Sequence, residues 1–222
     1  MRGVEDYLGQ VKRLEEDATR CTATVLARTL HVSLPSASEM LKRLSAEGYV
    51  ERTKDGSVLL TADGRVQATR NLRRHRLVER LLTSILGMPW HEVHEEAHRL
   101  EHAVSARVEE RLAQTLGFPE YCPHGLPICP VDPRELRALN DEVVGDAVAV
   151  AQVSEVSGEL PGFLHETGMS PGALIKVIDA APFGGPFTIE TSAGRVSIGR
   201  EVAALVRVCS PEDAELIHGR AV

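Results

Sequence analysis

The fold is decided by residues 22–61, which read TATVLARTLHVSLPSASEMLKRLSAEGYVERTKDGSVLLT. Ser33 offers an N-cap and Pro35 falls in the first turn of a helix, whose apolar side chains then recur at helical spacing. Two β-rich segments follow, joined by Asp55-Gly56, a sequence typical of a tight hairpin turn. A short helix, a tight connection, a second helix and a hairpin together predict a winged helix-turn-helix.

The same apolar spacing and turn residues predict the other elements. In the head we expect helices over 4–18, 22–30 and Ser33–Glu47, and strands over Tyr49–Thr53 and Val58–Thr61. Next we expect a helix ending near Leu86, a helix over 91–116, a connector over 118–133 with five prolines, and a short helix over 134–140. From about residue 145 four or five short strands indicate a small β-barrel, so the fold class is α+β.

Composition and charge narrow the class of protein. At 222 residues with 43% hydrophobic and 26% charged residues, the chain is neither disordered nor a disulfide-rich scaffold. Residues 1–75 carry 13 Lys+Arg against 10 Asp+Glu, whereas residues 76–222 carry 12 against 22. A basic head on an acidic body suits a protein that meets a polyanion only through its head. Because no signal-like or membrane-spanning apolar run occurs, we expect a cytoplasmic protein with reduced thiols.

Histidines and carboxylates gather in the two helices that follow the head. His94, His98, Glu101 and His102 fall within a narrow arc of one face if the helix over 91–116 is continuous, and His91 precedes them. The preceding helix adds His75 and Glu79 at i, i+4. Imidazole and carboxylate together suit divalent first-row metals. The pattern therefore predicts metal binding, with a solvated helix face as the alternative for any one of these residues.

The order of these motifs resembles the diphtheria-toxin-repressor/manganese-transport-regulator family. The resemblance rests on RRHRLVERLL at 73–82, VHEEAHRLEH at 93–102 and CPHGLPI at 122–128, between a winged helix and a small β-domain. It implies a metal-dependent regulator, not an enzyme, that binds DNA as a homodimer. The implied domains are a DNA-binding head over 1–72, a helical dimerisation and metal-binding domain over 73–140, and an SH3-like, FeoA-type β-domain over 141–222.

The resemblance also implies two metal positions in each subunit. The first would use His75, Glu79 and His94, completed from the β-domain by Glu155, with Glu159 as the nearest substitute for a family glutamine that falls near Gly158. The second would use Asp6, His98, Glu101 and His102. Iron-selective members place a cysteine at the position of His98 and a methionine at that of Asp6, so this chain lacks the soft sulfur ligands. We therefore expect Mn²⁺, with Fe²⁺ as the alternative and Zn²⁺ possible in vitro.

DNA contacts are expected from the second helix of the head and from the wing. The candidates are Ser33, Pro35, Ser36, Ser38, Glu39, Lys42, Arg43, Arg52 and Lys54. A metal that joins Asp6 in the head to the histidine cluster in the body would narrow the range of head orientations, and a dimer reading a palindromic operator would then bind more tightly. The implied targets are metal-uptake genes. The two-fold interface could use apolar positions that could equally form core: Leu77, Val78, Leu81, Leu82, Ile85, Leu100, Val104 and Val108.

Three other interpretations remain open at this point. H-x-x-E-H at 98–102 matches an inverted zinc-peptidase signature, although a peptidase needs a further ligand and an open metal position. A winged-helix regulator could instead sense a small organic ligand. Cys122, His124 and Cys129 could hold zinc, but a structural turn with reduced thiols is favoured because only three candidate ligands occur.

Overall fold

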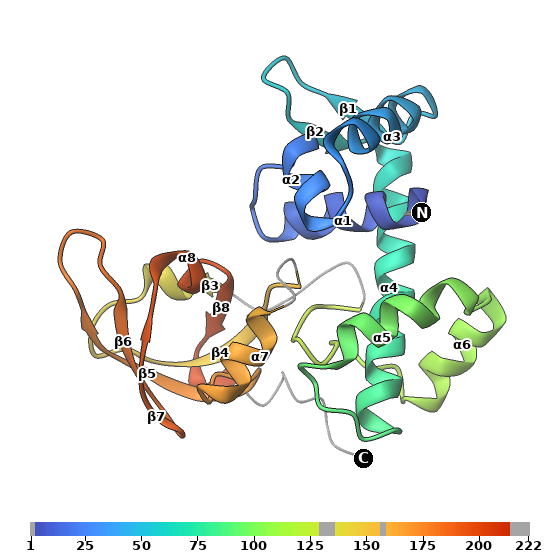
Figure 1. Cartoon of the computed structure of the whole chain (residues 1–222). Coiled ribbons are helices and arrows are strands. Elements are labelled where there is room, and N and C mark those ends of the chain that lie inside the picture. Colours follow the sequence, from blue (N-terminus) through green and yellow to red (C-terminus); the bar gives the residue numbers. More distant parts are fainter. Residues whose placement is uncertain (1–2, 129–135, 156–158, 214–222) are drawn as a thin grey trace. The chain divides into compact units, whose positions relative to one another are not determined.

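The structure, a computed structural model, describes residues 3–128, 136–155 and 159–213. It divides into two compact units, Met1–Arg74 and His75–Val222 (Figure 1). Helix α4 (Ala62–Ser84) begins in the first unit and ends in the second. In the described part of the chain, no helix has both the length and the apolar character needed to cross a membrane.

The first unit is a winged helix-turn-helix, which confirms the prediction. Its elements are α1 (Val4–Glu16), α2 (Ala23–Thr29), α3 (Leu34–Ala46), β1 (Val50–Arg52) and β2 (Val58–Leu60). Ser33 caps α3 as expected, because its side chain accepts a hydrogen bond from the backbone N–H of Ser36 at 3.3 Å. Leu8, Leu26 and Leu41, from three different helices, are fully buried. Their burial holds the three helices together.

The helix predicted over 91–116 is wrong as a single element. The structure has α5 (Val93–Leu100), a 3-10 turn η1 (Glu101–Ala103) and α6 (Ala106–Thr115). Val104 between them is extended, with φ −81° and ψ 108°. The physical reason is Ser105, whose side chain caps the N–H of Val108 and so starts a new helix. Glu101 and His102 therefore lie on a turn beyond α5.

The β part of the second unit is an antiparallel six-stranded sheet of order β3-β8-β4-β5-β6-β7. The strands are β3 (Arg137–Ala138), β4 (Ala147–Val153), β5 (Leu174–Ala180), β6 (Phe187–Thr191), β7 (Gly194–Ile198) and β8 (Val206–Cys209). The register pairs Val150 with Val208 and Ile189 with Val196. The core under this sheet includes Val150, Val177 and Ile189, all fully buried. The small β-domain is thus confirmed.

Short helices complete this part of the chain, and some of them differ from expectation. They are η2 (Leu139–Asp141), α7 (Leu160–Glu166), α8 (Arg200–Ala203) and η3 (Pro211–Asp213). The helix predicted over 134–140 is wrong where the structure describes it, because strand β3 and the start of η2 occupy residues 137–140. Residues 134 and 135 lie outside the described residues.

The apolar positions proposed for either core or dimer interface differ in their burial. Leu77, Val78 and Leu82 of α4 are buried and belong to the core of the helical part. Ile85, Leu100 and Val108 are exposed, while Leu81 and Val104 are partly buried. Ile85, Leu100 and Val108 therefore remain candidates for an interface, because they leave apolar side chains in contact with solvent in a single chain.

Candidate metal centre

Helices α4 and α5 bring three of the expected ligands together. His75 and Glu79 lie one turn apart on α4 and are fully buried. The Glu79 Oε1 atom lies 3.0 Å from His75 Nε2 and 3.2 Å from His94 Nδ1 of α5. His75 Nε2 and His94 Nδ1 are themselves 3.2 Å apart. Three potential ligand atoms thus point at one place inside the helical part.

The loop 121–128 adds two side chains to the same place. His124 is fully buried, and its Nδ1 atom lies 3.3 Å from Glu79 Oε1. The Cys122 thiol is buried and donates to Glu155 Oε1 at 3.7 Å. Glu155 itself follows strand β4 and is 7% exposed. The loop is anchored to α4 because Arg80 donates to the carbonyl oxygen of Tyr121 at 2.6 Å.

Two overlapping ligand sets result, which share Glu79 and Glu155. In one set His75 and His94 complete the four, and in the other Cys122 and His124 do so. Within each set, one ligand atom from every residue lies within 4.8 Å of the others. We call these six residues the Glu79 centre. Acidic, imidazole and thiol groups so close together are suited to a divalent cation.

The electrostatics of the Glu79 centre follow from burial opposed by charge. Burial raises the pKa of Glu79, but His124 and His75 outweigh it and hold that pKa well below its usual value. Burial lowers the pKa of His124, yet the carboxylates of Glu79 and Glu155 raise it above the usual value. Burial and the same carboxylates raise the pKa of Cys122 well above its usual value. A carboxylate that stays ionised in a buried place favours a cation beside it.

Two buried polar atoms of the Glu79 centre indicate whether a metal ion fits there. Glu79 Oε2 and His124 Nε2 are both buried and have no hydrogen-bond partner within the described residues. Buried polar atoms in proteins are usually paired, so such atoms call for an explanation. Each carries a lone pair that a metal ion can accept. The residues present therefore fit a bound divalent cation.

A second cluster lies at the end of α5, where His98, Glu101 and His102 come together. Glu101 Oε1 lies 2.8 Å from His98 Nδ1 and 3.6 Å from His102 Nε2. The other carboxylate oxygen, Oε2, lies 2.7 Å from His75 Nδ1. Glu101 therefore connects this second cluster directly to the Glu79 centre through a ligand of each. Such a contact can orient the His75 ring for metal binding.

The remaining residues singled out in the sequence belong to different elements. Asp6 belongs to the first unit, where its Oδ2 atom accepts the backbone N–H of Gly3 at 2.7 Å and caps α1. Glu159 is exposed at the N-cap of α7 and is not part of any ligand cluster found in the described residues. His91 stacks on His165 instead, with ring centroids 3.9 Å apart. Gly158 and Cys129 lie outside the described residues.

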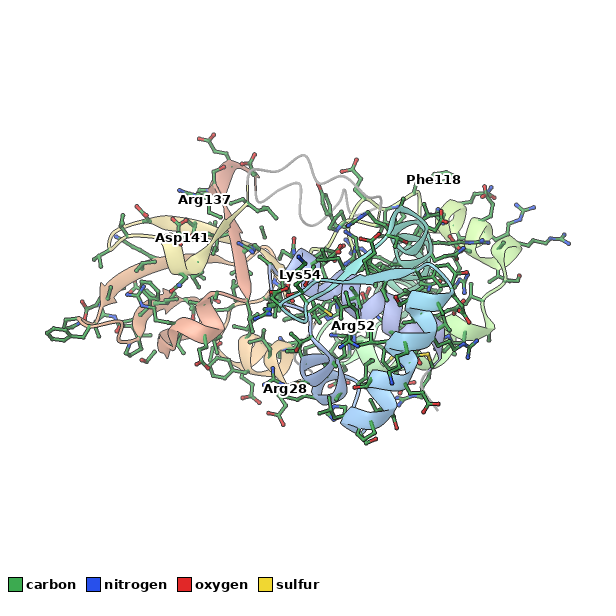
Figure 2. The ribbon with its side chains drawn as sticks, turned by 90° about the horizontal axis from the view of Figure 1, so that it is seen from above. Arg28, Arg52, Lys54, Phe118, Arg137 and Asp141 are labelled. Atoms are coloured by element: carbon green, nitrogen blue, oxygen red, sulfur yellow. The ribbon has the colours of Figure 1, made fainter. Side chains whose placement is uncertain are left out.

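The candidate DNA-contacting residues lie on α3 and the wing of the first unit. All are exposed except Ser38, which is half-buried: Ser33, Pro35, Ser36, Glu39, Lys42, Arg43, Arg52 and Lys54. Figure 2 shows Arg52 and Lys54 together on the hairpin, and Arg28 on α2. Hydrogen bonds from Thr53 and Ser57 lower the pKa of Asp55 to about 2 and fix the turn of the wing. The wing therefore presents its cations on a defined turn.

Comparison with known protein families covers most of the chain. Residues 1–58 match the iron dependent repressor N-terminal DNA binding domain, and residues 61–130 match the iron dependent repressor metal binding and dimerisation domain. Residues 137–209 match the FeoA domain. The iron-dependent repressor IdeR of Mycobacterium tuberculosis (strain H37Rv) is 33% identical over 220 residues, which cover 92% of this chain and 95% of the relative. The chain belongs to the diphtheria-toxin-repressor family.

Other members of the diphtheria-toxin-repressor family agree. The diphtheria toxin repressor of Corynebacterium diphtheriae is 37% identical over 157 residues, which cover 71% of this chain and 67% of the relative. A manganese-dependent transcriptional repressor solved in complex with manganese is 33% identical, covers 93% of this chain and 99% of that chain, and has a TM-score of 0.83. The T. acidophilum IdeR structure is 25% identical over 95% of this chain and 99% of that chain, with a TM-score of 0.84.

Membership of this family decides between the interpretations left open by the sequence. Its members are transcriptional repressors, not enzymes. The peptidase interpretation of the H-x-x-E-H segment is therefore set aside. The turn after α5 also separates Glu101 and His102 from the continuous helix on which that signature depends.

Cys122 and His124 are the residues whose place sequence reasoning missed. The segment was interpreted as a structural turn because it offers only three candidate ligands within itself. The structure adds the carboxylates of Glu79 and Glu155, which are far away in the sequence. The signal that was present is the pair of a thiol and an imidazole two residues apart in a proline-rich connector.

Proposed function

We propose that this chain is a manganese-dependent transcriptional repressor that binds operator DNA as a homodimer when its metal sites are loaded. The observation that carries the proposal is the Glu79 centre, where ligand atoms of four residues lie within 4.8 Å in a buried place. Buried charged and unpaired polar atoms are costly unless a partner compensates them. Family relatives that depend on iron or manganese support a metal as that partner.

The second metal position would be completed by Asp6 of the head together with His98, Glu101 and His102. These ligands supply carboxylate oxygen and imidazole nitrogen without sulfur. Hard ligands of this kind favour Mn²⁺ over more thiophilic ions. Fe²⁺ is the alternative, and Zn²⁺ would bind in vitro because imidazole suits it equally well.

At the Glu79 centre the type of metal ion would determine which of the two ligand sets coordinates it. A hard ion would take His75 and His94 with the shared carboxylates of Glu79 and Glu155. A thiophilic ion would take Cys122 and His124 instead. In either set the bound cation would supply positive charge that neutralises two buried carboxylates. Glu159, exposed at the N-cap of α7, belongs to neither ligand set.

The repression mechanism we infer is linkage between metal and DNA. An ion held by Asp6 and by the cluster after α5 would tie the head to the body and narrow the range of head orientations. A dimer that binds two half-sites at fixed separation would then lose less conformational entropy when it binds the operator. Ile85, Leu100 and Val108 of the helical part are exposed and apolar, which supports a two-fold interface that uses these residues.

The remaining assignments complete the proposal. The family models at 1–58, 61–130 and 137–209 support domains over 1–72, 73–140 and 141–222. The operator is palindromic because a two-fold dimer reads two equivalent half-sites. The genes controlled are those of metal uptake, and the protein acts in the cytoplasm, where it meets DNA.

A DNA-binding titration tests this function. Fluorescence anisotropy of a labelled operator would be followed with Mn²⁺, Fe²⁺, Zn²⁺ or a chelator. We expect tight binding with Mn²⁺ and its loss with the chelator. Equal binding with and without metal would contradict the proposal and support a regulator that senses a non-metal ligand.

Two variants of Asp6 sharpen the same titration. Asp6→Ala removes both the charge and the cap on Gly3, whereas Asp6→Asn keeps an acceptor for the Gly3 N–H. If Asp6 is a metal ligand, both variants lose Mn²⁺-dependent binding, and Asp6→Asn keeps an unfolding temperature close to that of the wild type. If only Asp6→Ala loses binding, the cap rather than the charge matters, and the linkage is wrong.

A further inference from the structure

Trp90, the single tryptophan of the chain, links the helical and β parts of the second unit. It lies in the connection between α4 and α5, and its side chain packs against the core of the β-sheet. The indole Nε1–H donates to Ser170 Oγ at 3.2 Å. Beside it, His91 stacks on His165 of α7 at 3.9 Å between ring centroids. The connection between two metal-binding helices is thus held by the β part.

The same tryptophan also touches the Glu79 centre. The Trp90 ring meets the His124 ring edge to face, with centroids 5.6 Å apart. The carbonyl oxygen of His124 in turn accepts the backbone N–H of Val153 in β4 at 3.0 Å. Trp90 therefore packs on the ligand His124. It also donates to Ser170, which lies near strand β4, and this strand precedes the ligand Glu155.

Ser170 begins a short turn whose later residues are hydrogen-bonded to that strand. Ala173 donates to the Ser170 carbonyl oxygen at 2.9 Å, and Gly172 donates to the Val150 carbonyl oxygen at 2.7 Å. Val150 belongs to β4, which runs directly toward Glu155. The turn thus connects Ser170 to the strand that precedes the buried carboxylate of Glu155.

The position of Glu155 depends on how the β part packs against the helical part. It is the one ligand of the Glu79 centre that comes from the β part, whereas the others come from α4, α5 and the loop 121–128. Both of its neighbours in the centre, His124 and Cys122, lie within 4 Å. Metal affinity depends steeply on ligand position, and outer contacts that orient ligands contribute roughly 10- to 100-fold.

We propose that Trp90 is a positioning residue for the Glu79 centre, which acts by holding the β part so that Glu155 reaches the metal. This proposal rests on the proposed function, because it requires that the centre binds a metal ion. Trp90 itself donates no ligand. Its effect should be larger at the centre that uses Glu155 than at the cluster of His98, Glu101 and His102, which takes no ligand from the β part.

The experiment measures Mn²⁺ and Zn²⁺ binding to the full chain by calorimetry. Trp90→Phe keeps an aromatic ring on the β core but removes the donor to Ser170, and Ser170→Ala removes the acceptor. We expect each variant to weaken binding at the Glu79 centre by roughly tenfold. The double variant should lose no more than either single one, because both remove the same hydrogen bond. Glu166→Ala, an exposed change on α7, is the matched control.

Binding at the cluster after α5 serves as the internal standard. A purely structural loss would weaken both positions alike, whereas a positioning role weakens the one that contains Glu155 more than the other. If Trp90→Phe and Ser170→Ala bind at both positions like the wild type, or weaken both equally, the positioning role is wrong. If the wild type itself binds neither ion, the proposed function fails first, which separates the two failures.

Tryptophan emission provides a second readout. Because Trp90 is the sole tryptophan and its ring contacts that of His124, loading the Glu79 centre should change its emission. Ser170→Ala should shift the midpoint of that change to higher metal concentration. An emission change with an unaltered midpoint would overturn the proposal.

Discussion

Among single residues, Glu79 contributes most to the metal centre, because its carboxylate belongs to both ligand sets. One oxygen of its carboxylate lies within 3.3 Å of three different imidazole rings, and the other is buried with no hydrogen-bond partner within the described residues. His124 and His75 overcome the effect of burial and keep its pKa well below the usual value. Both ligand sets therefore contain a carboxylate that is already ionised.

Replacing that carboxylate by an amide should remove binding at this centre. Glu79→Gln keeps the shape of the side chain but loses the charge and one strong donor oxygen. We expect a loss of more than roughly 100-fold in Mn²⁺ affinity at this position, beyond the range for outer contacts. Equilibrium dialysis measures it, with the exposed Glu95→Gln on α5 as the control. Unchanged affinity in Glu79→Gln would exclude this residue as a ligand.

Protonation makes a second prediction for single residues. The pKa of Cys122 lies well above its usual value and that of His124 is also raised, so both groups hold their protons more firmly than free side chains. A metal binds only the deprotonated forms, so protons compete with it and affinity should rise with pH. Calorimetry of Zn²⁺ binding in buffers of different ionisation enthalpy counts the protons released. Cys122→Ser should release fewer, and an equal count would show that the thiol does not ligate.

At the scale of elements, loop 121–128 is built to lie against strand β4. Gly125 has φ +81°, and a Cβ atom there would lie 1.9 Å from the carbonyl oxygen of Ala151. Arg76 donates to the carbonyl oxygen of Pro127 at 2.8 Å and holds the other end of the loop on α4. The loop carries His124 into the centre only because its backbone approaches the strand this closely.

Gly125→Ala should therefore push the loop away from β4. The added methyl group meets backbone rather than a flexible side chain, and the positive φ adds strain, so we expect a loss of about 2 kcal/mol or more in stability. Gly117→Ala is the matched control, because Gly117 has φ +71° but nothing within 4 Å of its Cβ position. Thermal unfolding compares the two. If Gly125→Ala costs no more than Gly117→Ala, the close approach does not support the loop.

Local signals explain which elements could be predicted from the sequence. Ser33, Pro35 and Asp55-Gly56 act within a few residues of themselves, so the winged helix follows from them directly. The break before α6 escaped prediction because Ser105 resembles any polar residue within a helical pattern until its side chain is seen to cap Val108. Helix boundaries are the least predictable feature of such patterns.

The candidate site shows the same division. His75 and Glu79 could be found because helical spacing places them on one face. Glu155 was reached only through the family resemblance. Cys122 and His124 could not be joined to the site, because their partners lie on α4 and after β4 and meet them only through tertiary packing.

At the scale of the whole molecule, the two units carry different tasks. The first unit presents α3 and the wing, and the second contains both His/Glu clusters, which Glu101 connects. The proposed function requires that one divalent cation be held both by Asp6 of the first unit and by His98, Glu101 and His102 of the second. Through it, metal supply would set how readily the two heads of a dimer fit the operator.

Anomalous diffraction from crystals grown with excess Mn²⁺ tests this claim most directly. We predict a manganese peak within about 2.3 Å of an Asp6 carboxylate oxygen and of ligand atoms from His98, Glu101 and His102, a normal range for divalent metal ligands. A fully loaded crystal in which manganese lies at the Glu79 centre alone, or in which Asp6 still caps Gly3 and touches no metal, would contradict it.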